Sequence, residues 1–174
     1  MKQQRLAMLG VIVAVVIGAG SVCAASLAGQ PAPDLRVQAL TGQDLDLAKL
    51  RGQVVVIHFW ATWCPPCRAE MPMLDSVYQR YRQQGLAMIA LSVDRRHDRD
   101  TAVKAAQAFS YPAAMLSEAQ TNGFGLPSSL PLTFVIDRAG IVRYEFTEAG
   151  GGLTEAALTA AITGLLPAQP ARKQ

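Results

Sequence analysis

A run of apolar, mostly β-branched residues extends from Val54 to Trp60, broken only by His58, and it constrains the fold more than any other segment. A strand with one face in water alternates apolar and polar residues, whereas a continuous apolar run needs cover on both faces. Such strands lie at the centre of a sheet and are typical of parallel sheets. We therefore expect residues 54–60 to form the central strand of an α/β domain.

Helical and strand patterns follow this run. The expected elements are a helix over 65–84 that ends at Gly85, a strand over 86–93, a helix over 101–109, strands over 132–136 and 141–146, and a helix over 154–166. Residues 35–53 contain turns, and residues 110–130 are expected to be irregular. Helical crossovers make the first half of the sheet parallel, and the tight turn at 137–140 makes the second half antiparallel.

Residues 1–28 differ in composition from the rest of the chain. They begin with Lys2 and Arg5, continue with an uncharged apolar run and end in small residues, which is the pattern of a secretory signal. The uncharged run 6–28 is also long enough to span a bilayer, which takes about 20 residues. A cleaved signal peptide and an uncleaved membrane anchor are therefore alternatives. Lipidation at Cys23 is a third one, which the bulky Val22 disfavours.

Under each alternative the basic N-terminus stays in the cytosol and the domain at residues 29–166 is exported. We expect this domain to be periplasmic or otherwise extracytoplasmic. It would be either free or tethered to the membrane by residues 6–28. Residues 167–174 are expected to form a tail.

The chain of 174 residues is 51% hydrophobic and 17% charged, which excludes a disordered protein. A net charge of +3 without a basic cluster gives no case for nucleic-acid binding. The charged run 94–100 is interpreted as a solvated loop.

The sequence Trp63-Cys64-Pro65-Pro66-Cys67 directly follows the central strand. Cysteines at positions i and i+3 of a first helical turn are close enough to form a disulfide. Cys64 precedes the helix, where unpaired N–H groups and the helix dipole favour a thiolate, whereas Cys67 is expected to be more shielded. A Cys64 thiolate would attack a substrate disulfide, and Cys67 would resolve the mixed disulfide. The direction of electron flow stays open.

The cysteine pair could serve two other purposes, a metal site or a structural disulfide. A Cys-x-x-Cys pair is half of a structural zinc site, which needs four ligands. Only His58 and His97 could add nitrogen ligands, so no metal is expected. A purely structural disulfide is the second alternative, although a bridge that closes so short a loop constrains the unfolded chain weakly.

Residues 52–72, which contain the cysteine pair, resemble the active-site segment of thioredoxin-like proteins, and more narrowly that of the exported, often membrane-tethered TlpA/ResA-type thiol–disulfide oxidoreductases. Residues 130–137 and Ala32-Pro33-Asp34 are also similar, so the resemblance covers about residues 31–166. It implies a thioredoxin-like fold, with a mixed sheet flanked by helices. It also implies a redox-active Cys64–Cys67 disulfide and no other cofactor.

The resemblance assigns roles to residues around the disulfide. Pro131 matches a cis-proline that faces the cysteines across a substrate groove, which leaves the Leu130 backbone free to pair with an extended peptide. Trp63 flanks this groove. Pro65 and Pro66 influence the redox potential in a direction that the sequence does not reveal.

Two titratable residues have open roles. Glu70 lies three residues after Cys67, where some relatives carry an acid that assists proton transfer; the alternative is a solvated carboxylate. His58 stands where thioredoxins carry a buried aspartate. It either shuttles protons or is a core histidine with satisfied hydrogen bonds.

The leading function is an exported oxidoreductase that reduces or exchanges disulfides of envelope proteins, as in cytochrome c maturation or metal-site assembly. A membrane thiol donor would supply electrons, because the compartment is oxidising. One alternative is a peroxiredoxin-like peroxidase, but the Pro-x-x-x-Thr-x-x-Cys pattern is missing before Cys64. The other is a copper carrier, which usually has a wider cysteine spacing and a distal histidine, whereas no histidine follows His97.

Overall fold

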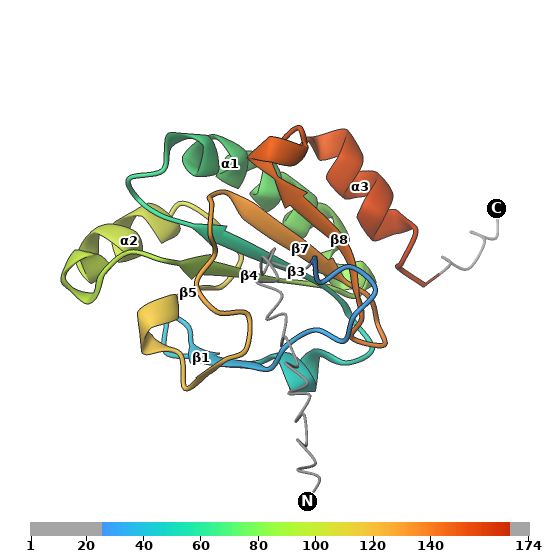
Figure 1. Cartoon of the computed structure of the whole chain (residues 1–174), viewed down its shortest axis with the longest axis horizontal. Coiled ribbons are helices and arrows are strands. Elements are labelled where there is room, and N and C mark those ends of the chain that lie inside the picture. Colours follow the sequence, from blue (N-terminus) through green and yellow to red (C-terminus); the bar gives the residue numbers. More distant parts are fainter. Residues whose placement is uncertain (1–25, 168–174) are drawn as a thin grey trace, which may run out of the picture.

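A computed structural model describes residues 26–167 and contains a five-stranded mixed sheet (Figure 1). Its strands are β3 (Val54–Trp60), β4 (Leu86–Ser92), β5 (Ala113–Met115), β7 (Leu132–Ile136) and β8 (Val142–Thr147), in the order β5-β4-β3-β7-β8. β3, β4 and β5 are parallel, whereas β7 pairs antiparallel with both β3 and β8. The predicted mixed α/β fold, with a parallel first half and an antiparallel second half, is confirmed.

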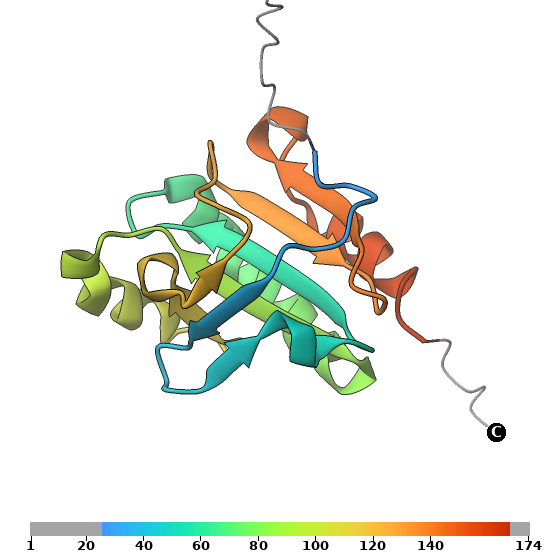
Figure 2. The same ribbon diagram turned by 60° about the horizontal axis from the view of Figure 1, so that its bottom comes forward.

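Two layers cover the two faces of this sheet. The helices α1 (Pro65–Tyr81), α2 (Arg99–Ala106) and α3 (Glu155–Thr163) contribute buried residues to one core cluster, on the face shown with α1 and α3 in Figure 1. The opposite face packs against a small antiparallel sheet of β1 (Leu35–Gln38), β2 (Asp44–Asp46) and β6 (Thr121–Asn122), which Figure 2 brings forward. The sheet is therefore buried on both sides.

β3 lies at the centre of the sheet, and all seven of its residues are buried. Val54, Val56 and Trp60 belong to the helix-side cluster, whereas the intervening apolar residues belong to the cluster beneath the small sheet. Because successive side chains of a strand point to opposite faces, His58 shares the helix side. The interpretation of residues 54–60 as a central strand covered on both faces is confirmed.

The predicted elements from residue 65 onward exist; β7 has the predicted bounds, and the others have at least one shifted end. α1 ends at Tyr81 and continues as a 3₁₀ turn to Gln84, where Gly85 adopts φ 97°. A positive φ favours glycine, which explains why the helical chain stops there. α2 starts at Arg99 and ends at Ala106, so both of its ends lie earlier in the chain than those of the predicted range 101–109. α3 is shorter than the predicted 154–166.

The expectation of turns and irregular chain at 35–53 and 110–130 was incomplete. These segments contain β1, β2, β5 and β6, each of two to four residues. Strands this short have little periodicity to recognise, and their pairing with distant segments stabilises them. The chain also forms single 3₁₀ turns, namely η1 (Leu47–Leu50), η2 (Arg82–Gln84), η3 (Arg96–Asp98), η4 (Leu116–Glu118) and η5 (Glu148–Gly150).

Most of the expected signal or anchor, including Cys23, lies outside the described residues, as does the tail beyond residue 167. The described part of the leader, residues 26–28, packs against the domain. The Ser26 hydroxyl donates to Glu145 at 2.9 Å, and Leu27 packs against the core beneath the small sheet. Within residues 26–167, no helix has the length and hydrophobicity needed to cross a membrane.

Candidate functional site

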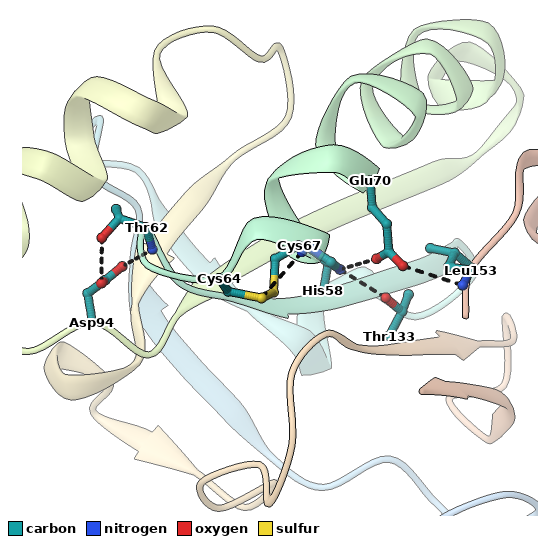
Figure 3. The surroundings of a disulfide bond; sticks show 8 residues. All are labelled: His58, Thr62, Cys64, Cys67, Glu70, Asp94, Thr133 and Leu153. Carbon is teal, nitrogen blue, oxygen red and sulfur yellow. Dashed lines mark hydrogen bonds and ion pairs between the residues drawn. A yellow bond between two sulfur atoms is a disulfide. The ribbon is translucent and has the colours of Figure 1, made fainter. Parts of the chain in front are cut away.

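A disulfide joins Cys64 and Cys67 at the N-terminus of α1, with 5.4 Å between the two Cα atoms (Figure 3). Cys64 is the N-cap residue, and its sulfur accepts a hydrogen bond from the Cys67 N–H at 3.3 Å. Pro65 and Pro66 occupy the first two helical positions, where no N–H is needed. Cys64 is 4% exposed and Cys67 is fully buried, so the prediction that Cys67 is the more shielded sulfur is confirmed.

The turn between β3 and α1 is held by Asp94, which lies just beyond the end of β4. The Asp94 carboxylate accepts hydrogen bonds from the Thr62 N–H at 2.9 Å, the Thr62 hydroxyl at 2.8 Å and the Ser92 hydroxyl at 2.7 Å. Asp94 is 1% exposed. The interpretation of 94–100 as a solvated loop was therefore wrong at its first residue, which anchors the chain two residues before Cys64. It was also incomplete, because residues 96–100 form η3 and the start of α2.

An apolar groove opens beside Cys64. It is lined by Trp63, Cys64, Pro65, Pro66, Val93 and residues 126–130. The Leu130–Pro131 peptide bond is cis, as the resemblance implied. Trp63 is 66% exposed and Leu126 is 77% exposed, although both are large apolar residues. Exposed apolar side chains that surround a reactive group indicate a surface that binds a partner.

Glu70 and His58 lie on the helix side of β3, close to each other (Figure 3). The His58 Nδ1 atom is 2.9 Å from the Thr133 hydroxyl oxygen and 4.0 Å from the Glu70 Oε2 atom. The other carboxyl oxygen of Glu70 accepts the Leu153 N–H at 3.4 Å. Strands β3 and β7 and helix α1 thus bring three polar side chains together inside the core.

Burial shifts the pKa of both titratable groups. Desolvation lowers the pKa of His58 to about 3, so the imidazole is neutral at neutral pH. Burial also raises the pKa of Glu70 to about 7, and the Glu148 charge adds to this, while the Leu153 N–H opposes it. The Glu70 side chain is only 11% exposed, which disfavours the solvated-carboxylate alternative. The hydrogen-bonding capacity of His58 is only partly satisfied, because no group within residues 26–167 forms a hydrogen bond with its Nε2 atom.

The model of the AhpC/TSA family matches residues 28–145 of this chain. The chain belongs to the AhpC/TSA family. Its relatives include the thiol–disulfide oxidoreductase ResA of Bacillus thuringiensis, 35% identical over 117 residues that make up 66% of each chain. ResA of Geobacillus thermodenitrificans is 34% identical over 154 residues, which cover 82% of this chain and 87% of the relative.

Solved structures of thiol:disulfide interchange proteins align with the chain as well. A Chlorobium tepidum protein described as the thiol:disulfide interchange protein DsbE aligns with a TM-score of 0.68 at 27% identity, over 79% of this chain and 96% of that one. A second thioredoxin-family interchange protein of Chlorobium tepidum aligns with a TM-score of 0.65 at 26% identity, over 81% and 99% of the two chains. The resemblance to ResA-type oxidoreductases with a thioredoxin-like fold is confirmed.

Most of the predicted site residues fall into two groups. Trp63, Cys64, Pro65, Pro66 and Leu130 line the groove. Cys67 is bonded to Cys64, and Pro131 follows Leu130 without being one of the lining residues. Glu70 and His58 form the buried polar group with Thr133, which sequence reasoning missed.

Thr62, Asp94, Leu126 and Leu153 were missed as well. Each acts through a contact between segments that are distant in the sequence, or through its exposure. A usable signal existed for Asp94, because polar residues at the carboxyl ends of adjacent parallel strands meet at one edge of the sheet.

Proposed function

We propose that this protein is an exported thiol–disulfide oxidoreductase that reduces or exchanges disulfides of extracytoplasmic proteins. The observation that carries the proposal is the arrangement of the two cysteines. One sulfur lies at the helix N-terminus beside an apolar groove, and the other is buried behind it. Family membership and the ResA relatives support the same chemistry.

In the reduced enzyme, the Cys64 thiolate attacks one sulfur of a substrate disulfide, and a mixed disulfide forms while the other substrate sulfur leaves and takes up a proton. Cys67 then loses its proton and attacks the Cys64 sulfur. The Cys64–Cys67 bond forms and the second substrate thiol leaves, so the substrate is reduced by two electrons and the enzyme is oxidised. The Cys67 N–H and the helix dipole favour the Cys64 thiolate.

The Cys67 proton needs an acceptor within the buried part of the site. Glu70 lies three residues further along α1, on the same side of the helix. Its pKa is raised to about 7, so it can take up and release a proton close to neutral pH. We assign Glu70 as the group that accepts the Cys67 proton when Cys67 attacks.

The groove favours an extended peptide as substrate. Leu130 lines it directly before the cis-proline, so its backbone is available to pair with a passing strand. Trp63 and Leu126 offer exposed apolar surface on the same groove. A substrate cysteine with an apolar neighbour would bury this surface when it reaches Cys64.

Export rests on the basic and apolar pattern of residues 1–28, which acts as a signal peptide or as an anchor. Outside the cytosol a reductase needs electrons from the membrane, so a membrane thiol protein is the expected donor. Cytochrome c apoproteins and metal-site proteins with oxidised cysteines are the expected substrates. Fractionation of cells that express the full chain, with a variant lacking residues 1–28 as control, tests export.

Insulin reduction with the purified domain tests the chemistry. The wild-type protein should reduce insulin, Cys64→Ser should have no activity, and equal activity of the two proteins would refute the assignment. A peroxide-consumption assay distinguishes this activity from that of a peroxidase. The Cys64–Cys67 reduction potential tests the direction: a value well below that of the compartment supports a reductase, and a value near that of strong oxidants overturns it.

A further inference from the structure

The buried histidine has one hydrogen to donate and two oxygen atoms on one side of its ring. Its neutral ring carries a single N–H, on either Nδ1 or Nε2. Nδ1 lies 2.9 Å from the Thr133 hydroxyl oxygen and 4.0 Å from Glu70 Oε2, whereas no described group bonds Nε2. A buried N–H without an acceptor is rarer than a bare acceptor. On this ground the hydrogen is assigned to Nδ1.

Three elements fix this arrangement. His58 and Thr133 are directly opposite each other in the antiparallel pairing of β3 with β7. Helix α1 crosses the same face of the sheet and contributes Glu70 together with Cys67, which belongs to the helix-side core cluster. The fold thus places the histidine, two oxygen atoms that could accept its hydrogen and the resolving cysteine on one side of the sheet.

The other groups that face Glu70 leave one of its carboxyl oxygens without a hydrogen bond. Oε1 accepts the Leu153 N–H, which comes from the loop before α3, and Glu148 of η5 adds negative charge. Oε2 is buried and accepts no hydrogen bond from residues 26–167. On the neighbouring helix surface, Arg80 pairs with Glu155. The His58 Nδ1–H is therefore the group placed to stabilise a charge on Oε2.

We propose that Thr133 and Glu70 compete for the Nδ1 hydrogen of His58, and that this competition sets the pH range in which Glu70 takes the Cys67 proton. The proposal rests on the proposed function. His58 and Thr133 are positioning residues, because they act through Glu70. While Thr133 accepts the hydrogen, the Glu70 Oε2 atom has no donor; a small movement of Glu70 across the 4.0 Å gap would let Oε2 accept the hydrogen instead.

Competition predicts that two substitutions shift the titration of Glu70 in opposite directions. His58→Leu removes the donor, so the charged carboxylate loses support and the pKa of Glu70 should rise. Thr133→Val removes the competing acceptor and leaves the hydrogen to Glu70, so the pKa should fall. The expected size is about half a pH unit to one pH unit in each direction, which corresponds to one net hydrogen bond.

NMR titration of labelled glutamate side chains in the full domain measures these shifts directly, with Glu70→Gln identifying the Glu70 signal. The pH profile of insulin reduction gives a second readout. Thr133→Ser and His58→Asn are the conservative controls: the serine variant should keep the wild-type midpoint, and the asparagine variant should lie between wild type and His58→Leu.

Opposite shifts would support the competition. Equal midpoints, or shifts in the same direction for His58→Leu and Thr133→Val, would overturn it, and so would a Thr133→Ser shift as large as that of Thr133→Val. The NMR readout separates this inference from the proposed function. Opposite shifts in a protein that does not reduce insulin would refute the function and leave the competition supported.

Discussion

Asp94 accepts hydrogen bonds from both the N–H and the hydroxyl of Thr62, at 2.9 and 2.8 Å. This contact joins the end of β4 to the turn that carries Cys64. Asp94→Ala should leave the Thr62 N–H without its acceptor and lower the free energy of unfolding by about 2–3 kcal/mol. Urea unfolding of the oxidised protein measures this loss.

Thr62→Val is the matched control for Asp94→Ala. It removes the hydroxyl bond and keeps the backbone bond, so it should cost only about 1 kcal/mol. Equal losses in the two variants would mean that the backbone N–H contact contributes nothing.

Cys67→Ser should trap the first step of the reaction. Without the second thiol, the mixed disulfide between Cys64 and the substrate cannot be resolved by the enzyme, so it should accumulate. Non-reducing electrophoresis and mass spectrometry of the protein incubated with an oxidised peptide would detect the adduct. A double variant with Cys64→Ser is the control and should form none; an adduct in that variant would show that another group reacts.

Shortening the groove residues should weaken peptide binding. Trp63→Ala and Leu126→Ser remove apolar surface that a substrate would cover, which should raise KM for a peptide disulfide by about tenfold. Reduction of a small dye disulfide should change far less, because it does not fill the groove. Tyr144→Ser on β8 is the control, since Tyr144 is also a large exposed side chain, at 42%. A similar KM increase in this control would argue against a specific groove.

The buried histidine should make the fold sensitive to acid. The pKa of His58 is lowered by burial from 6.5 to about 3, so between these values the unfolded chain binds a proton that the folded chain does not. The free energy of unfolding should therefore decrease as pH falls from about 6.5 towards 3, by up to about 1.4 kcal/mol per pH unit.

His58→Asn should reduce this slope, as measured by denaturant unfolding at a series of pH values. His97→Asn is the matched control, because the His97 side chain is 69% exposed. If His97→Asn reduced the slope as much as His58→Asn, the acid sensitivity would not come from burial.

Glu70 should have the opposite pH dependence. Burial raises its pKa from 4.5 to about 7, so the folded chain holds a proton that the unfolded chain has lost over this range. Stability from this group is fully present below about pH 4.5 and is lost as pH rises through about 7. Thermal unfolding of Glu70→Gln should show a smaller decrease in Tm over the range, while Glu155→Gln, an exposed glutamate of α3, should follow the wild type.

The central strand, the cysteine pair and the helix that follows could be predicted because their signals are local. The apolar run 54–60 requires burial on both faces, and the spacing of Cys64 and Cys67 fits one helical turn wherever that helix lies. The turn at Gly85 is local too, since it depends on one residue with φ 97°. The cis bond before Pro131 was expected from family resemblance, not from its own residues.

The small sheet of β1, β2 and β6 could not be predicted, because strands of two to four residues depend on pairing with distant partners. The same holds for the pairs that surround the disulfide. Thr62 and Asp94 are 32 residues apart in the chain, and His58 and Thr133 are 75 apart.

The sequence alone therefore determined the reactive chemistry: two cysteines at the start of a helix that follows a buried strand. Only the tertiary structure decided which polar groups lie near it, because strand register and helix packing bring His58, Thr133 and Glu70 together, the first two fully buried and the third mostly so. Burial and the distances between charges set pKa values, and neither is encoded by local spacing.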